Sequence, residues 1–283
     1  MPWLSWSIEP CVVSQVKRLA VSSVLSMNTL SLPWISVVIP IKDERDNIPL
    51  LASQLLKFFD MRPESAVAPF ELILVDDGST DGSETLLDEL VMQSPAVRVI
   101  HLDDNHGQTA AFDAGFRQAK GELIATMDGD LQYDPNDFAK LLPLVNQFDL
   151  VCGRRAARHD NMVRRWSSII ANHVRNWVVH DGISDTGCSL KIFRRAVVER
   201  IPLFKNMHRF FPALAQMYGF TVAEVPVQHF PRAHGVSKYG VGNRLFVGLY
   251  DLLAVRWMQK RCLNFTMRES KGSPSNERPK SDG

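Results

Sequence analysis

The chain has 283 residues, enough for one large α/β domain or for two small ones. Its formal net charge of +1 at pH 7 argues against a nucleic acid partner bound through overall charge, so any electrostatic recognition must be local. The four cysteines are scattered without a CxxC pair; they indicate neither a disulfide framework nor a zinc site and favour a reducing cytoplasm.

Composition predicts that both ends of the chain lie outside the globular domain. Residues 1–33 are expected to form a flexible extension and not a secretory signal, because charged residues interrupt their apolar stretch. Residues 263–283 are polar and rich in Ser, Pro and Gly, which predicts a disordered tail. The globular domain is therefore expected over residues 34–241.

Short apolar runs alternate with helical patterns from Trp34 onward. WISVVIP, the first run, is a continuous apolar stretch rich in β-branched residues, typical of a strand buried on both faces. The segment after it places Ile48, Leu51 and Leu55 on one helical face. Strands are predicted over residues 34–40, 70–75, 97–102, 122–127, 148–153, 188–193 and 221–230, and helices over 45–60, 83–93, 106–120 and 194–200, with a further helix ending near 179.

Acidic residues follow several of these predicted strands. The repeated strand–helix alternation indicates a mostly parallel, doubly wound α/β sheet. Ligands bind such sheets at the carboxyl ends of the strands. Three acidic clusters lie just past strand ends: Asp43-Glu44, Asp76-Asp77 and Asp128/Asp130. They are expected to converge on one edge of the sheet.

The sequence Asp128-Gly129-Asp130 has three interpretations. It could belong to a turn that caps the next helix, which Asp134-Pro135 would open, or it could be a solvated acidic patch. The third interpretation is a divalent-cation site, because Mg²⁺ and Mn²⁺ prefer carboxylate oxygens together with substrate phosphates. The motif alone does not choose among them.

Four motifs in series resemble those of the inverting family-two glycosyltransferases with a GT-A fold. They are VVIPIKDE (37–44), LVDDGSTDG (74–82), NHGQTAAFDAG (105–115) and DGDLQYDP (128–135). Lys42-Asp43 departs from the Tyr-Asn usual in that family. The resemblance implies a nucleotide-sugar donor bound with Mg²⁺ or Mn²⁺. It assigns Pro40, Glu44, Asp76 and Asp77 to the nucleoside, Asp128 and Asp130 to the metal and pyrophosphate, and Gln132 to the neighbourhood of the metal. Gly129 is assigned to nucleotide-sugar binding.

Two basic segments narrow the resemblance to dolichyl- and polyprenyl-phosphate sugar transferases. One is GRRAARHDNMVRRWSS (153–168) and the other is FPRAHGVSKYG (230–240); taken alone, each is equally compatible with an ordinary solvated segment. By resemblance, Arg232 and Lys238 would close over the diphosphate and sugar. Arg154, matched to a Gly-x-Arg motif, and Arg164 with Ser168, matched to Arg-xxx-Ser, would bind the acceptor phosphate.

The segment Met207-His208-Arg209 stands where many related enzymes carry a Glu-Asp base. A hydroxyl acceptor benefits from such a base. A phosphate monoester, with its second pKa near ~6, is already largely anionic at neutral pH. The predicted reaction is therefore an inverting, metal-dependent transfer of a hexose from GDP-mannose or UDP-glucose to a polyprenyl phosphate, with Asp128, Asp130, Arg154 and Arg164 as the catalytic residues.

Other functions remain compatible with the sequence. A non-lipid glycan acceptor in surface polysaccharide synthesis is the alternative reaction, and a non-catalytic nucleotide-sugar-binding protein is the alternative class. A dinucleotide-dependent dehydrogenase is excluded, because no GxGxxG turn follows the first strand.

Residues 242–262 bear on access to a lipid acceptor. No stretch reaches the roughly 20 apolar residues that a membrane-spanning helix needs. The segment predicts an amphipathic helix in the membrane interface, with Trp257 at headgroup level, or else a final helix packed on the core. The first interpretation makes the enzyme peripheral on the cytoplasmic face of the inner or plasma membrane.

Overall fold

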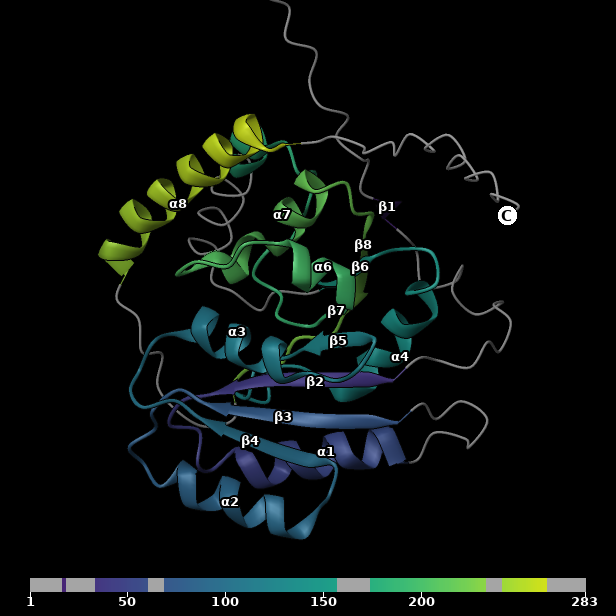
Figure 1. Cartoon of the computed structure of the whole chain (residues 1–283), viewed down its shortest axis with the longest axis vertical. Coiled ribbons are helices and arrows are strands. Elements are labelled where there is room, and N and C mark those ends of the chain that lie inside the picture. The colour runs from purple at the N-terminus through teal and green to yellow at the C-terminus, as the bar shows by residue number, and fades with distance from the viewer. Residues whose placement is uncertain (1–16, 19–33, 61–68, 157–173, 233–240, 264–283) are drawn as a thin grey trace, which may run out of the picture.

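The computed structural model describes residues 17–18, 34–60, 69–156, 174–232 and 241–263. They form an α/β fold around one eight-stranded sheet with the order β1-β8-β6-β7-β5-β2-β3-β4 (Figure 1). Neighbouring strands are parallel except at β7, which runs antiparallel to both β5 and β6. The strands are β1 (Lys17–Arg18), β2 (Ile35–Ile41), β3 (Phe70–Asp76), β4 (Val97–His101), β5 (Leu123–Thr126), β6 (Leu150–Arg155), β7 (Lys191–Arg194) and β8 (Val222–Val227). The predicted mostly parallel sheet is confirmed.

Helices cover both faces of the sheet, so that strands such as β2 are buried on both sides. Val37 and Ile39 of β2 face one apolar cluster and Val38 faces the other, which is why this strand is a continuous apolar run. The first cluster includes residues of α1 (Ile48–Asp60), α2 (Ser83–Gln93) and α4 (Phe138–Leu141). The second includes residues of α3 (Gln108–Gln118), α6 (Arg195–Arg200), α7 (Phe211–Met217) and α8 (Val241–Arg261). Short 3₁₀ helices are η3 (Pro135–Asp137), η4 (Leu142–Leu144) and η5 (Met207–Phe210).

Two predicted elements begin three residues later than expected. Helix α1 starts at Ile48 instead of residue 45, because residues 44–47 form a turn in which the Asn47 N–H donates to the Glu44 carbonyl (2.9 Å). Strand β7 starts at Lys191 instead of residue 188. Ser189 bonds outside the strand ladder instead: its carbonyl accepts from the Thr126 hydroxyl (2.6 Å).

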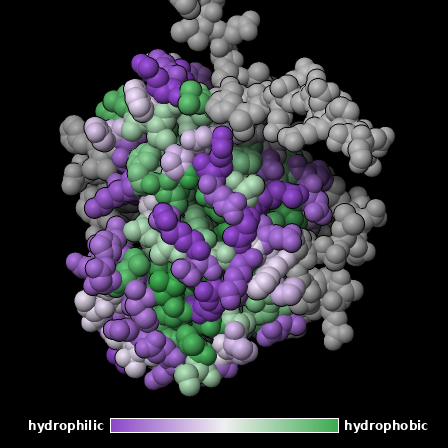
Figure 2. All heavy atoms as spheres, viewed as in Figure 1, coloured by the Kyte–Doolittle hydropathy of each residue, from purple (hydrophilic) through white to green (hydrophobic). Residues whose placement is uncertain are grey.

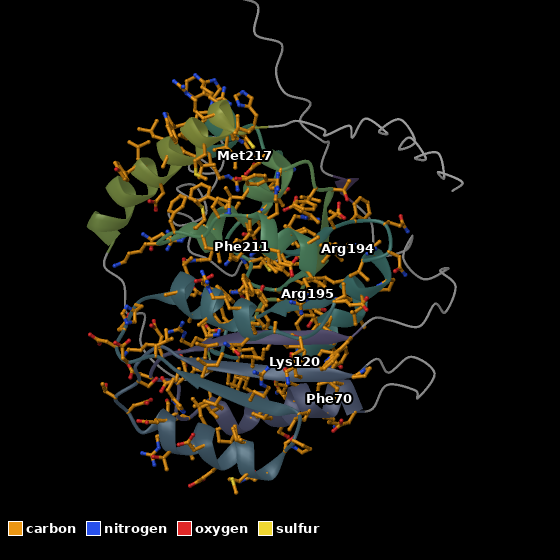
Figure 3. The ribbon with its side chains drawn as sticks, viewed as in Figure 1. Phe70, Lys120, Arg194, Arg195, Phe211 and Met217 are labelled. Carbon is orange, nitrogen blue, oxygen red and sulfur yellow. The ribbon has the colours of Figure 1, made fainter. Side chains whose placement is uncertain are left out.

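Polar groups at the amino end of the sheet are paired with one another. The buried Glu71 carboxylate accepts from the Ser36 hydroxyl (2.6 Å), the Arg98 guanidinium (2.7 Å) and the Lys120 backbone N–H (2.7 Å). The Arg195 guanidinium donates to the Ala119 carbonyl (2.9 Å), close to this network (Figure 3). We interpret this edge as structural, because its charges are satisfied by the protein itself.

Helix α8 packs on the body and also exposes apolar side chains. Leu252 and Val255 are buried, and the Gln259 side-chain amide donates to the Val179 carbonyl (2.9 Å), which joins α8 to the helical residues 174–179. The buried Asp251 interacts with Asn206 and Arg209. On its other side, the exposed large apolar residues of α8 are Leu249, Tyr250, Leu253 and Trp257. The described helix therefore has features of both interpretations given for this segment.

Within the described ranges, no helix combines the length and the apolar character that crossing a bilayer requires. Two residues of the expected N-terminal extension, Lys17 and Arg18, are described, and they pair with β8. The expected tail beyond residue 263 and the segments 157–173 and 233–240 lie outside the described residues.

Candidate nucleotide-sugar and acceptor site

The acidic clusters and two of the arginines converge on one edge of the sheet, as predicted. Because β2, β3, β4, β5, β6 and β8 all run in the same direction, their carboxyl ends share this edge. Backbone bonds join the ends of neighbouring strands: the Asp77 N–H donates to the Ile41 carbonyl and the Leu102 N–H donates to the Asp76 carbonyl (both 2.9 Å). The antiparallel β7 adds its first residues to the same edge.

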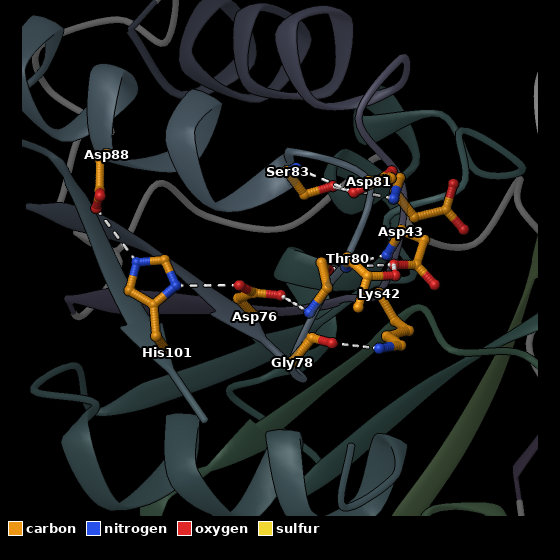
Figure 4. A network of polar contacts seen from close by, with 11 residues as sticks. Lys42, Asp43, Asp76, Gly78, Thr80, Asp81, Ser83, Asp88 and His101 are labelled. Carbon is orange, nitrogen blue, oxygen red and sulfur yellow. Dashed lines mark hydrogen bonds and ion pairs between the residues drawn. The ribbon is translucent and has the colours of Figure 1, made fainter. Parts of the chain in front are cut away.

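The loops after β2 and β3 are bound tightly to each other (Figure 4). The Lys42 ammonium donates to the Gly78 carbonyl. The Asp43 carboxylate accepts from the Thr80 backbone N–H (2.7 Å), and the Asp43 N–H donates to the Ser79 hydroxyl (2.9 Å). Lys42-Asp43, the departure from the family pattern, thus connects the two loops. We define residues 76–82 (DDGSTDG) as the acidic loop.

Gly78 in the acidic loop has a positive φ of 67°. A Cβ atom there would lie 2.7 Å from the backbone carbon of Asp104, so a larger residue would displace the neighbouring segment. The requirement for glycine shows how closely this loop packs against the chain that follows β4.

Asp76 and Asp77 both hold backbone groups in place. Asp76 accepts from the Ser79 N–H (2.8 Å) and contacts His101 Nδ1 (3.1 Å). Asp77 accepts from the backbone N–H groups of His106 (2.7 Å) and Gly107 (3.0 Å), while burial raises the pKa of its carboxyl group. Both residues lie at the expected edge, and both shape the surrounding loops. The Glu44 carboxylate, also assigned to the nucleoside, accepts from the Asn47 amide (2.5 Å).

The turn formed by Asp128, Gly129 and Asp130 packs on the end of β2. A Cβ atom at Gly129 would lie 2.7 Å from Ile41 Cδ1 and 3.3 Å from the Pro40 carbonyl oxygen, so only glycine fits without movement. Leu131, which follows the turn, has a φ of 59°, a conformation that non-glycine residues adopt mainly at strained or functional positions. The predicted Pro40 and Gly129 are therefore adjacent.

Asp128 is held from two directions. The Gln108 side-chain amide donates to Asp128 Oδ1 (2.7 Å), and the Asp128 N–H donates to the Ser189 hydroxyl (3.0 Å). Burial, and then the negative charge of Asp130, raise the pKa of the Asp128 carboxyl group to about 6. The turn thus concentrates negative charge that a cation would stabilise.

Asp130 already pairs with a cation of the protein. Its carboxylate is buried and accepts from the Arg232 guanidinium (2.8 Å). The Gln132 amide donates to the Phe230 carbonyl (3.3 Å), which connects the same turn to the segment after β8. Two carboxylates one residue apart with a nearby amide oxygen fit a hard divalent cation that also binds substrate phosphates. Among the described residues, no cluster of three or more His, Cys, Asp or Glu forms a cage made by the protein alone.

The geometry of this turn bears on its two other interpretations, a helix-capping turn and a solvated acidic patch. Asp134 does cap η3, since its carboxylate accepts from the Asn136 N–H (2.8 Å). Asp128 and Asp130 take no part in that cap, and the burial of Asp130 contradicts a solvated acidic patch. Capping therefore explains Asp134 and not the pair before it.

Two arginines lie at the end of β6, on the same edge. The Nε atom of Arg154 is buried without a hydrogen-bond partner among the described residues. Arg155 instead makes two bonds to the Asp185 carboxylate (2.7 Å each), and this pairing raises the pKa of its guanidinium further despite burial. The Gly-x-Arg spacing, counted from Gly153, falls on Arg155, so both arginines are candidates for the acceptor phosphate. The Asp185 carboxylate is therefore paired with the Arg155 guanidinium.

His208 lies in the segment that lacks an acidic base. Its Nδ1 is 2.8 Å from the Thr109 hydroxyl. Burial, and then the charges of Arg209 and Lys191, lower the pKa of its imidazole to about 3. The ring is therefore neutral at physiological pH.

Some predicted residues could not be placed, and others were missed. Arg164, Ser168 and Lys238 lie outside the described residues. Sequence reasoning did not find Gln108, Ser189 or Lys191, although Lys191 is buried and lowers the pKa of Asp128. Gln108 is 20 residues from Asp128 and Ser189 is 61 residues away, so no local spacing signals these contacts.

The fold is similar to that of several enzymes of known structure. It is similar to a mannosyltransferase from Pyrobaculum calidifontis solved with GDP-mannose and Mn²⁺, with a TM-score of 0.57 and 18% identity over 90% of this chain and 71% of that one. It is also similar to glucosyl-3-phosphoglycerate synthase from Mycobacterium tuberculosis, solved with Mn²⁺ and UDP, with a TM-score of 0.58 and 17% identity over 82% of this chain and 81% of that one. At these identities the likeness concerns the fold.

Sequence comparison identifies the family. The profile of Glycosyl transferase family 2 matches residues 36–202, and the chain belongs to that family. It is 38% identical to dodecaprenyl-phosphate galacturonate synthase of Rhizobium johnstonii, over 80% of this chain and 67% of the relative. It is 36% identical to undecaprenyl-phosphate 4-deoxy-4-formamido-L-arabinose transferase of Pseudomonas fluorescens, over 77% of this chain and 64% of the relative. The chain thus spans about two thirds of the length of these relatives.

Proposed function

We propose that this chain transfers a sugar from a nucleotide-diphosphate donor to a polyprenyl phosphate, with inversion at the anomeric carbon. The observation that carries the proposal is the arrangement of charge at one sheet edge. The Asp128/Asp130 turn there is paired with Arg232, and Arg154 lies at the same edge with a buried Nε that has no hydrogen-bond partner among the described residues. Both named relatives act on polyprenyl phosphates, which supports this acceptor.

On the donor side, the chain's own residues would orient and neutralise the diphosphate. Asp128 and Asp130 would hold Mg²⁺ or Mn²⁺ with Gln132 nearby, and the ion would stabilise charge on the departing diphosphate. Arg232 is close enough to Asp130 to add a second positive charge beside the leaving group. Gln108 and Ser189 fix the orientation of Asp128 before substrate arrives.

On the acceptor side, a phosphate monoester needs orientation more than deprotonation. One of its anionic oxygens forms the bond to the anomeric carbon while the bond from that carbon to the diphosphate oxygen breaks, and the nucleoside diphosphate leaves with the bonding electrons. No proton has to be removed. Arginine suits the task because its planar guanidinium can donate two hydrogen bonds to one phosphate. The neutral His208 agrees with an active site that lacks a strong base at this position.

The identity of the donor is the finer part of the proposal. The sequence favours a hexose from GDP-mannose or UDP-glucose, and the named relatives add galacturonate and 4-deoxy-4-formamido-L-arabinose as candidate sugars. These candidates differ in the nucleobase or in the sugar, and mannose differs from glucose at C2, the carbon next to the anomeric carbon. A donor panel can therefore separate them without changing the acceptor.

We further propose that α8 attaches the enzyme to the bilayer that contains its acceptor. Leu249, Leu253 and Trp257 recur every four residues, Tyr250 lies three residues before Leu253, and the four side chains are 48%, 56%, 64% and 76% exposed in that order. They form one apolar stripe, and the last turn of the helix contains Lys260 and Arg261. Figure 2 shows hydrophilic side chains at the upper end of α8 and hydrophobic ones beside them. An apolar stripe ending in basic residues suits an anionic membrane surface.

The proposed function predicts that labelled sugar will enter an organic phase. The assay incubates the full chain with each labelled donor and undecaprenyl phosphate, with Mn²⁺, with Mg²⁺ or with EDTA. We expect one donor to give a lipid-soluble product in equimolar amount with nucleoside diphosphate, and no product in EDTA. Label that appears in a water-soluble glycan, or nowhere, would contradict the lipid acceptor.

A further inference from the structure

His101, at the end of β4, lies between two carboxylates. Its Nδ1 is 3.1 Å from Asp76 Oδ2 and its Nε2 is 3.2 Å from Asp88 Oδ1 (Figure 4). Asp76 comes from the end of β3 and Asp88 comes from α2, so the two acids approach the ring from the two elements that flank it. A carboxylate can only accept a hydrogen bond, so both ring nitrogens must donate. This geometry favours the doubly protonated imidazolium.

The contact between His101 and Asp76 continues into the acidic loop. The other carboxylate oxygen of Asp76 accepts from the Ser79 N–H (2.8 Å). Ser79 in turn accepts from the Asp43 N–H (2.9 Å), and its neighbour Gly78 accepts from Lys42. The charge on His101 thus supports an orientation of Asp76 that arranges the loops after β2 and β3. Neither His101 nor Asp88 belongs to the residues assigned to substrate.

We propose that His101 is a positioning residue for nucleotide binding: as an imidazolium held by Asp88, it fixes Asp76 and, through Asp76, the acidic loop. The proposal rests on the proposed function, because it assumes that this loop binds the nucleoside of the donor. It goes beyond that function in making donor affinity depend on a histidine that does not contact the donor.

The sign of the pH dependence follows from the charges. Hydrogen bonds to Asp76 and Asp88 raise the pKa of His101 above its ordinary value near ~6.5, in opposition to burial. The imidazolium is therefore complete at low pH, and the support it gives is lost as the pH rises through the raised pKa. Nucleotide affinity should weaken over that alkaline range. Neutralising Asp88 removes one of the two acids that raise the pKa of His101, so the loss of nucleotide affinity should occur at a lower pH.

The experiment measures the dissociation constants of UDP and of GDP by calorimetry with the full chain and Mn²⁺, from pH 6 to pH 9. The variants are His101→Gln, which removes the charge, and Asp88→Asn, which keeps a hydrogen-bond acceptor for Nε2. We expect His101→Gln to bind the preferred nucleotide roughly 10-fold more weakly at pH 6.5 and to lose the wild-type pH dependence, in keeping with a loss of about 1.4 kcal/mol. Asp88→Asn should bind the nucleotide normally at pH 6. As the pH rises, its nucleotide affinity should begin to fall at a lower pH than that of the wild type.

A second measurement follows the loop without ligand. The protection of the Ser79 amide against hydrogen exchange should fall in His101→Gln and should fall in the wild type at alkaline pH. Unchanged nucleotide affinity and Ser79 protection in His101→Gln would overturn the inference. If that variant fails to fold, an Asp88→Asn affinity profile identical to the wild type would overturn it. A wild type that binds neither nucleotide would instead overturn the proposed function, and this inference with it.

Discussion

At the scale of single residues, the site contains charged groups that the protein itself does not fully neutralise and that a bound substrate would neutralise. Asp128 and Asp130 repel each other, and the raised pKa of Asp128 records part of that repulsion. Arg232 relieves part of it through Asp130, and Lys191 relieves part of it at Asp128. Residues with such unbalanced charge cost stability when the protein is empty and are retained at sites that bind an opposite charge.

The Asp130→Asn variant separates this chemistry from folding. It keeps the size of the side chain and removes the charge that would help to hold the cation and that pairs with Arg232. We expect turnover to fall by about 100-fold or more, because charge on the leaving diphosphate is no longer neutralised. The melting temperature should stay within a few degrees of the wild type.

A matched control for this variant is Asp134→Asn. Asp134 lies four residues further along the same segment and caps η3, and asparagine also caps helices well. Its turnover should remain close to that of the wild type. Equal losses in the two variants would indicate that the segment tolerates no change, and unimpaired turnover in Asp130→Asn would remove Asp130 from the mechanism.

At the scale of elements, the two sides of α8 differ: one is buried against the body of the protein and the other is exposed. Leu252 and Val255 anchor it on the apolar layer formed with α3 and α7, whereas Leu249, Tyr250, Leu253 and Trp257 remain exposed. Because both sides of α8 contain apolar residues, the hydropathy of the sequence alone does not distinguish the buried side from the exposed one.

Substitutions on the two sides of α8 should therefore differ in effect. Leu253→Glu places a charge on the exposed stripe, so we expect weaker binding to vesicles of anionic phospholipid and an unchanged melting temperature. Leu252→Ala, on the buried side, should lower stability by about 2–5 kcal/mol and leave vesicle binding of the folded protein intact. Cosedimentation with vesicles and thermal unfolding give the two readouts; vesicle binding that is the same in Leu253→Glu and the wild type would contradict the docking role.

At the scale of the whole molecule, much of the donor side could be predicted from the sequence. Buried parallel strands are continuous apolar runs, and acidic residues just past their ends must meet at one edge because the strands share a direction. Asp43, Asp76 and Asp128 lie at this edge, as predicted. The motif series then indicated the family to which the chain belongs.

Other features of the site depend on long-range contacts that no local sequence pattern indicates. CSLKIF reads as a strand, but nothing in it gives the direction of β7, and that direction brings Ser189 beside Asp128. His101 ends an ordinary strand, and its two carboxylate partners are 25 and 13 residues away. Arg164, Ser168 and Lys238 remain predictions, since they lie outside the described residues.

We propose that the donor's cation and the acceptor's phosphate lie next to each other at this edge of the sheet. The most direct test is the phosphorus NMR signal of a short-chain isoprenyl phosphate bound to the full chain with nucleoside diphosphate. We predict that the isoprenyl phosphorus signal broadens strongly when Mn²⁺ replaces Mg²⁺. This broadening should disappear in Asp130→Asn. A bound isoprenyl phosphate whose signal is the same with Mn²⁺ as with Mg²⁺ would place the two groups apart and contradict the account.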